Sequence, residues 1–226
     1  MGCIALGLLV LPFTLPGIDP DNSEETDRED LSRVRTRPLA PAIVLGLLVV
    51  LCISGMLIED AGFSWATLFM RDYANTGAAL AGSGYVVLLS THALGRFIAD
   101  PLVGRFGPRA VVAGGGALIL AGMGGGLLIG TTPALLFGFA TAGIGASASV
   151  PLAYNAAHDI RGMDPVVGLT IVSWLGRLAF LVAPPLVGVL VQHTSLLAAM
   201  LVIPAAGLAL MASSLVLAPR QLRVQK

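Results

Sequence analysis

Apolar and polar residues alternate along this chain in long blocks. Apolar stretches cover residues 42 to 58, 79 to 99, 110 to 130, 133 to 154, 166 to 191 and 196 to 218. About 20 helical residues cross a hydrocarbon core of roughly 30 Å, so each stretch is long enough, or nearly so, to span a bilayer. The pattern predicts an all-α polytopic membrane helix bundle, with six complete transmembrane helices in a domain covering residues 41 to 218.

The segment 1 to 17 is also apolar, but it is short and contains Pro12 and Pro16. We interpret it as a partial transmembrane helix, the end of a span. A signal peptide is the alternative, although signal peptides begin with a basic region and no Lys or Arg precedes Arg28.

Residues 18 to 40 differ sharply in composition from both neighbours. Acidic residues come first and Arg33, Arg35 and Arg37 follow next to the membrane. Such a charged segment with few apolar residues is typical of a solvated linker, and we predict that it is cytoplasmic. Residues 219 to 226 are predicted to form a cytoplasmic tail.

Composition narrows the class of protein further. Hydrophobic residues make up 56% of the chain and charged residues 12%, a combination that soluble domains of this length do not normally show. The zero net charge gives no sign of a nucleic-acid partner. Cys3 and Cys52 lie in apolar runs, so the sequence indicates neither a disulfide framework nor a metal site. We expect no cofactor and no enzymatic activity.

The positions of Lys and Arg predict the orientation. Cytoplasmic segments collect these cations, and a cytoplasmic linker leaves eleven of the 13 inside, with Arg71 outside and Arg177 within a span. We therefore expect an integral protein of a bacterial plasma (inner) membrane with its C-terminus in the cytoplasm. The predicted inside cations are Arg28, Arg33, Arg35, Arg37, Arg96, Arg105, Arg109, Arg161, Arg220, Arg223 and Lys226.

A charged segment joins the second and third apolar stretches. Residues 95 to 109 read Gly-Arg-Phe-Ile-Ala-Asp-Pro-Leu-Val-Gly-Arg-Phe-Gly-Pro-Arg. The segment resembles the signature loop of the major facilitator superfamily, in which a tight cytoplasmic loop carries Gly, Asp and then Gly-Arg with a basic end. A basic turn is the alternative, but it does not explain the acid. The residues of this predicted conformational loop are Gly95, Asp100, Gly104, Arg105 and Arg109.

The resemblance implies a secondary transporter with two six-helix halves joined by a polar linker. Each half contains two inverted three-helix repeats, so the six spans would form the C-terminal half. Asp100 would hold a helix end of the opposite half. Residues 59 to 69 resemble the seventh span of sugar-permease-like members, with Ser-Trp-Ala where those have Asp-Trp-Ser. Residues 181 to 188, with their Pro-Pro pair, resemble the fifth span of many such halves.

Arg177 is the strongest candidate for substrate binding. It lies about 17 Å along the fifth stretch at 1.5 Å per residue, near the midplane, where a charge costs roughly 2.5 to 3.5 kcal/mol. Ser173, Trp174 and Phe180 are near the same helical stripe. These residues predict a cavity lining for an anionic or polar solute. An ion pair with an acid elsewhere in the bundle is the alternative.

Glu59 and His92 are candidates for proton coupling, and Glu59 also for substrate binding. Glu59 lies about 25 Å along the helix from Ala42, which places it near the outer boundary, and a solvated helix end is the alternative role. His92 lies within the second span, where a titratable group can move protons. A hydrogen bond between helices is its alternative role.

Small residues and prolines predict how the spans pack and bend. Small residues let helix backbones approach each other in lipid, and a phosphate-binding loop is disfavoured because no Gly-Lys-Ser/Thr follows the glycines. Prolines interrupt helical hydrogen bonding. The positions are Gly114 to Gly116, Gly122, Gly126, Gly143 and Ser147 for packing, and Pro151, Pro184, Pro185 and Pro204 for bends.

Three functions are compatible with this pattern. We favour transmembrane transport of a small solute by alternating access, with proton coupling, by a half or truncated chain. A transport-incompetent fragment, or a half that needs the missing N-terminal half or a second copy as partner, is the second. An intramembrane serine protease is the third and is disfavoured, because residues 145 to 148 read Gly-Ala-Ser-Ala instead of Gly-x-Ser-Gly and lack a histidine base at membrane depth in the spans that follow.

Overall fold

Helices make up almost all of the chain that the structure describes. The computed structural model describes Thr36, residues 40–74 and residues 76–218. These belong to Val34–Lys226, one of two units into which the chain divides. The predictions for residues 1 to 17, for residues 219 to 226 and for most of the linker lie outside the described residues.

The described helices follow one another with short connections. They give six segments that are long and apolar enough to cross a membrane, as the sequence predicts, the fourth formed by α7 and α8 together and the sixth by α10, α11 and η2. The all-α membrane bundle is therefore confirmed. The helices are α3 Pro41–Asp72, α4 Ala78–Ala81, α5 Ser83–Phe106, α6 Pro108–Ile129, α7 Thr132–Ala146, α8 Ser149–His158, α9 Pro165–His193, α10 Leu196–Met200, α11 Val202–Ser213 and the 3-10 helix η2 Ser214–Val216.

The first span is much longer than its apolar stretch. Helix α3 continues past Glu59 to Asp72, because no proline or cluster of polar residues interrupts it there. Glu59 is therefore about 27 Å from the start of α3 and about 20 Å from its end. The placement of Glu59 at a solvated helix end is wrong: it lies in the interior of a helix.

The predicted loop at residues 95 to 109 is mostly helical. Helix α5 runs to Phe106 and α6 begins at Pro108, so Gly107 alone connects them, with φ of 85°. Only glycine adopts this conformation without strain, and proline is favoured at the first position of a helix. Arg96 consequently lies inside α5, about 15 Å from its C-terminal end, and not in a cytoplasmic loop.

The prolines differ in their effect on the spans. The fourth span breaks at residues 147–148, just before Pro151, and the sixth breaks at Leu201, just before Pro204. Each break precedes a residue that cannot donate a helical hydrogen bond. Pro184 and Pro185 do not break a helix, because α9 stays continuous through both. A bend of α9 at these residues stays a prediction.

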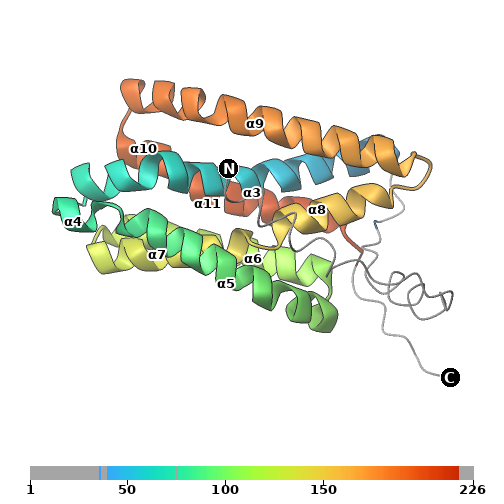
Figure 1. Ribbon diagram of the computed structural model, residues 1–226, viewed down its shortest axis with the longest axis horizontal. Coiled ribbons are helices and arrows are strands. Elements are labelled where there is room, and N and C mark those ends of the chain that lie inside the picture. The colour runs from blue at the N-terminus through green and yellow to red at the C-terminus, as the bar shows by residue number, and fades with distance from the viewer. Residues whose placement is uncertain (1–35, 37–39, 75, 219–226) are drawn as a thin grey trace, which may run out of the picture. The chain divides into compact units, whose positions relative to one another are not determined.

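Helix packing follows the small residues. Helix α3 lies between α9 and α5 in Figure 1, with α8 beside it, and α6 packs against α7 and α11. A Cβ atom on Gly116 would lie 2.5 Å from the carbonyl oxygen of Gly207, and one on Gly126 would lie 2.7 Å from that of Ala134. Close backbone packing is confirmed at these glycines, whereas Gly114 has open space around it.

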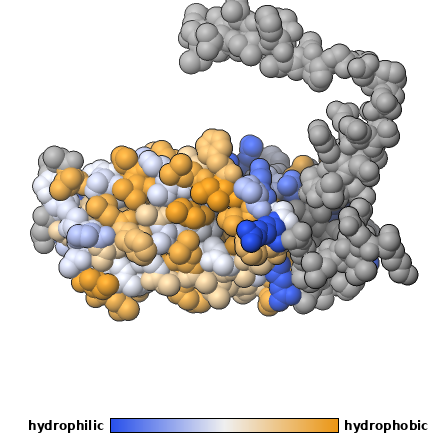
Figure 2. Space-filling view, turned by 90° about the horizontal axis from the view of Figure 1, so that it is seen from below, coloured by the Kyte–Doolittle hydropathy of each residue, from blue (hydrophilic) through white to orange (hydrophobic). Residues whose placement is uncertain are grey.

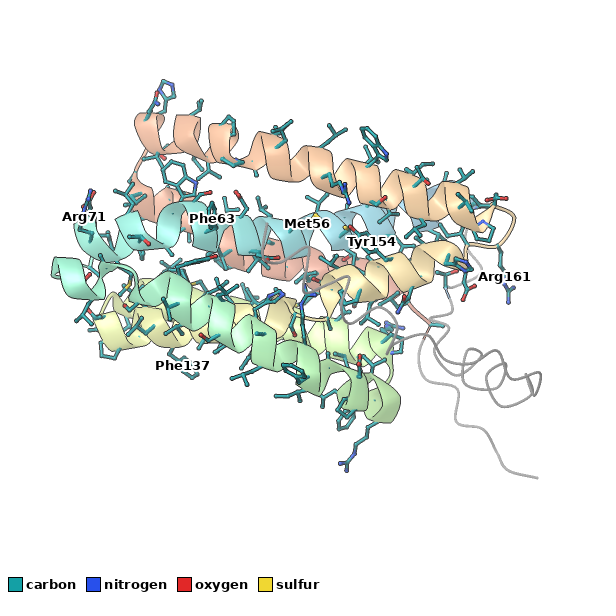
Figure 3. The ribbon with its side chains drawn as sticks, in the orientation of Figure 1. Met56, Phe63, Arg71, Phe137, Tyr154 and Arg161 are labelled. Carbon is teal, nitrogen blue, oxygen red and sulfur yellow. The ribbon has the colours of Figure 1, made fainter. Side chains whose placement is uncertain are left out.

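The surface of the bundle suits a lipid environment. Figure 2 shows a largely hydrophobic face with hydrophilic residues gathered toward one end, and side chains such as Phe97 and Leu128 are 83% and 90% exposed. Arg71 and Arg161 lie at opposite ends of the bundle in Figure 3. The chain is an integral membrane protein whose spans run between these two charged ends.

Candidate functional site

One face of α9 carries Arg177, the predicted substrate-binding cation. Arg177, Ser173 and Trp174 lie along this face, and Trp174 is 65% exposed. The side chain of Phe180 lies outside the described part. The face borders an open hollow of about 410 Å³, lined by Thr170, Ser173, Trp174, Arg177, Leu178 and Leu181.

Arg177 lies deep within its helix and is exposed on this face. It is about 18 Å from the start of α9 and about 24 Å from its end. Among the described residues, no ion pair or hydrogen bond holds its guanidinium, so the alternative of a structural ion pair within this bundle finds no support there. A mid-span cation of this kind is costly unless it has a partner or a function.

A tyrosine that the sequence reasoning missed lies near Arg177. The Tyr154 side chain of α8 interacts with the thiol of Cys52 on α3, and the charge of Arg177 reaches its hydroxyl. Helices α3 and α8, which carry Met56 and Tyr154 (Figure 3), pack against each other. One feature of the sequence could have pointed to Tyr154: it is an aromatic residue with a polar hydroxyl, three positions after Pro151 in an otherwise apolar span.

Close packing of α3 on α9 holds this region together. A Cβ atom on Gly176 would lie 2.9 Å from Sγ of Cys52 and 3.1 Å from Sδ of Met56. Since Gly176 directly precedes Arg177, the glycine lets α9 approach α3 where Arg177 emerges. Helices α3, α8 and α9 thus meet around one cation, one phenol and one thiol.

The structure brings the two proton-coupling candidates together. His92 on α5 is 5% exposed, and neither of its ring nitrogens has a hydrogen-bond partner in the structure. The charges that act on it come from Glu59 on α3 and from Arg96 on its own helix. The buried imidazole therefore lies within electrostatic reach of an acid on α3 and of an exposed guanidinium on its own helix.

Phe63 lies one turn beyond Glu59 along α3. It is 65% exposed, and its ring meets Tyr85 of α5 edge to face, with centroids 5.7 Å apart. An aromatic pair therefore lies one turn from Glu59, toward the end of α3 at Asp72.

The predicted loop residues between 95 and 109 do not form one cluster, and each has a different environment. A Cβ atom on Gly95 would lie 2.5 Å from Oγ of Ser147, so this glycine permits close packing of α5 on α7. Asp100 is exposed and has no ion-pair partner among the described residues. Arg105 lies 5.4 Å from the centre of the Phe106 ring. A Cβ atom on Gly104 would meet nothing within 4 Å, and Arg109 lies in the first turn of α6.

Ser147, the residue on which a protease reading depends, has a structural role here. Its hydroxyl donates a hydrogen bond to the carbonyl oxygen of Ile144 at 2.7 Å, and the residue is 3% exposed. A nucleophile needs a base within hydrogen-bond reach. No hydrogen bond joins Ser147 to a histidine in the part of the chain that the structure describes.

No protein-family model matches this chain. It is 28% identical over 200 residues to the membrane protein MosC of Rhizobium meliloti, covering 88% of this chain and 48% of MosC. It is 27% identical over 146 residues to an uncharacterised MFS-type transporter of Yersinia pestis, covering 65% of this chain and 38% of the relative.

A third relative is an uncharacterised transporter of Sinorhizobium fredii, 27% identical over 117 residues and covering 51% of this chain and 31% of the relative. The chain thus spans half the length or less of each of these curated relatives. The similarity to MFS-type transporters is confirmed, while the sugar-permease-like branch is not.

Proposed function

We propose that this chain, an MFS-like integral membrane protein, is the C-terminal six-helix half of a secondary transporter that moves a small solute by alternating access. The six spans over residues 41 to 218 support this, as do two relatives named as transporters, of which the chain covers 38% and 31% of the length. Residues 1 to 17 would be the end of a preceding span and residues 18 to 40 the linker between halves.

The observation that carries the proposed site is Arg177, a mid-span cation on an exposed face of α9 without an ion-pair partner in the described bundle. Ser173 and Trp174 on the same face can donate hydrogen bonds, and the hydroxyl of Tyr154 lies within the field of Arg177. Hydrogen-bond donors gathered around a cation favour an anionic or strongly polar solute. Glu59 would contact the same solute or its coupling proton from α3.

Proton coupling would use Glu59 and His92. Their proximity across α3 and α5 lets the carboxylate balance a proton on the imidazole, so that the pair carries no net charge while it holds the proton. Release of the proton would leave the Glu59 carboxylate charged. Asp100, exposed and without an ion-pair partner in the described part, would meet a helix end of the other half when the transporter closes.

The proposed partners are lipid and the other half of the transporter, supplied by an N-terminal segment or by a second copy. The proposed location is a bacterial inner membrane with the C-terminus in the cytoplasm. A transport-incompetent half is the second candidate, favoured by the partial coverage of the relatives. The protease function is not proposed, because the Ser147 hydroxyl is buried and bonded to the backbone.

The test compares two preparations in proteoliposomes: this chain alone, and this chain joined to any in-frame upstream six-span segment of its coding region. Uptake and efflux of radiolabelled carboxylates, sugars and cationic drugs are measured with and without a proton gradient. Flux that depends on Arg177 in either preparation supports the proposal. No flux of any solute in the joined chain would overturn transport, whereas flux in the joined chain only would identify this chain as an incompetent half.

A further inference from the structure

Asp60 is the one buried carboxylate among the described residues. It is 2% exposed and lies in the interior of α3, about 18 Å from the end at Asp72. The hydroxyl of Ser64 donates a hydrogen bond to Oδ1 at 3.3 Å, and Oδ2 has no hydrogen-bond partner. One oxygen of a buried acid is therefore left without a donor.

No cation on the packed helices compensates Asp60. Helices α4, α7, α10 and α11 and the 3-10 helix η2 carry no titratable side chain. Asp60 makes no ion pair or hydrogen bond with a titratable group on the helices that do carry them, as far as the described residues extend, nor with its neighbour Glu59. Those groups are Tyr85, His92, Arg96, Asp100 and Arg105 on α5, Tyr154 and His158 on α8, and Arg177 and His193 on α9.

An ionised Asp60 would therefore be an uncompensated charge inside a bundle in lipid. Such an ion costs several kcal/mol relative to water, and a carboxyl group can avoid this cost by binding a proton. A weak hydrogen bond at 3.3 Å from one hydroxyl offsets only a small part of that cost. A neutral, protonated Asp60 is therefore consistent with the burial of its side chain and with the lack of a cation beside it in the described bundle.

We propose that Asp60 is a proton-binding site in the interior of the bundle, separate from the Glu59 and His92 pair, and that it holds its proton at neutral pH. Its use in transport rests on the proposed function: the proton would leave only when α3 moves and water reaches Oδ2. The presence of the proton does not depend on transport, so the two ideas can fail separately.

Infrared spectroscopy of the full chain in lipid membranes tests this directly, because the carbonyl stretch of a protonated carboxylic acid is separate from the bands of a carboxylate. We expect a neutral-acid band at neutral pH that disappears in Asp60→Asn. The matched control is Asp72→Asn, since Asp72 is an exposed aspartate on the same helix, paired with Arg71 at 2.6 Å. The control variant should keep the band.

Asp60→Glu guards against a variant that fails to fold, because it should retain a neutral-acid band at a shifted frequency. Absence of the band from the wild-type chain at neutral pH, or its persistence unchanged in a folded Asp60→Asn, would overturn the proposal. The band with no solute flux in the joined transporter would leave the proton site standing and remove the transport function. Solute flux without the band would support the transport function and overturn the proton site.

Discussion

Replacing Gly115 by alanine should weaken the packing of α6 on α7, whereas the same change at the adjacent Gly114 should not. A Cβ atom at Gly115 would collide with the carbonyl oxygen of Gly145 and lie 3.2 Å from its carbonyl carbon. The contact is reciprocal, since a Cβ atom at Gly145 would collide with the carbonyl oxygen of Gly115. Nothing lies within 4 Å of a Cβ atom at Gly114.

The magnitude follows from comparing these two variants. Backbone atoms cannot rotate out of the way, so the helices must separate, and overpacking of this kind costs about 1 to 3 kcal/mol. Both variants gain the same helix propensity of about 1 kcal/mol, which cancels in the difference. At about 2 to 4 °C per kcal/mol for a chain of this size, Gly115→Ala should melt roughly 2 to 12 °C below Gly114→Ala.

Cys52 provides the assay. Its side chain is fully buried, and it is one of two cysteines in the chain. In a Cys3→Ser background, a thiol-reactive fluorophore therefore reports thermal unfolding in detergent micelles. Equal melting temperatures for the two glycine variants, or a higher one for Gly115→Ala, would refute the reasoning that direct backbone contact between α6 and α7 supports stability.

Four further outcomes are expected. Arg177→Ala should abolish solute flux in the joined transporter while membrane insertion, measured by carbonate extraction, stays normal; unchanged flux would remove Arg177 from the site. Tyr154→Phe should raise the KM for solute by roughly tenfold, because a lost hydrogen bond to a charged group costs about 1.5 kcal/mol, and an unchanged KM would exclude contact. Gly176→Leu should lower the melting temperature, because its side chain would meet Cys52. Finally, unfolding should release the proton of Asp60, so stability should fall by up to about 1.4 kcal/mol per pH unit as pH rises from about 4, where an unfolded aspartate ionises, to the pH at which the folded Asp60 ionises; Asp60→Asn should lack this slope in pH-dependent melting curves, and equal slopes would contradict it.

The prediction of six membrane spans, which depends only on the length of each apolar stretch along the chain, was successful. The number of spans follows from how many apolar residues cross a bilayer, a length that can be counted along the chain. Helix ends were harder, because they depend on local hydrogen bonds: α3 ends at Asp72, and in the turn that follows the hydroxyl of Thr76 donates to the carbonyl oxygen of Met70 at 2.7 Å. The turn at Gly107 was likewise overestimated in length, because Asp100 and Arg105 made a helical segment look like a loop.

The candidate site could be predicted only as separate residues. A mid-span Arg177 is visible in the sequence because any charge within an apolar run is unusual. Its neighbour Tyr154 is not, because that proximity depends on how α8 turns toward α9 after the break at residues 147–148. The role of the site in transport stays a prediction until flux is measured.

The sequence by itself determined that this chain lies in a membrane, that residues 41 to 218 contain six spans, and that Arg177 lies within one of them, since hydrophobic length and the cost of charge in lipid act on each segment independently. It misplaced Glu59 and Arg96, whose positions depend on where the helices end. Only the tertiary structure decided which faces of the helices meet: it placed Glu59 within electrostatic reach of His92 and buried Asp60 without a cation. These are properties of packing between helices distant in the chain, where glycine contacts set the spacing, and no single segment contains them.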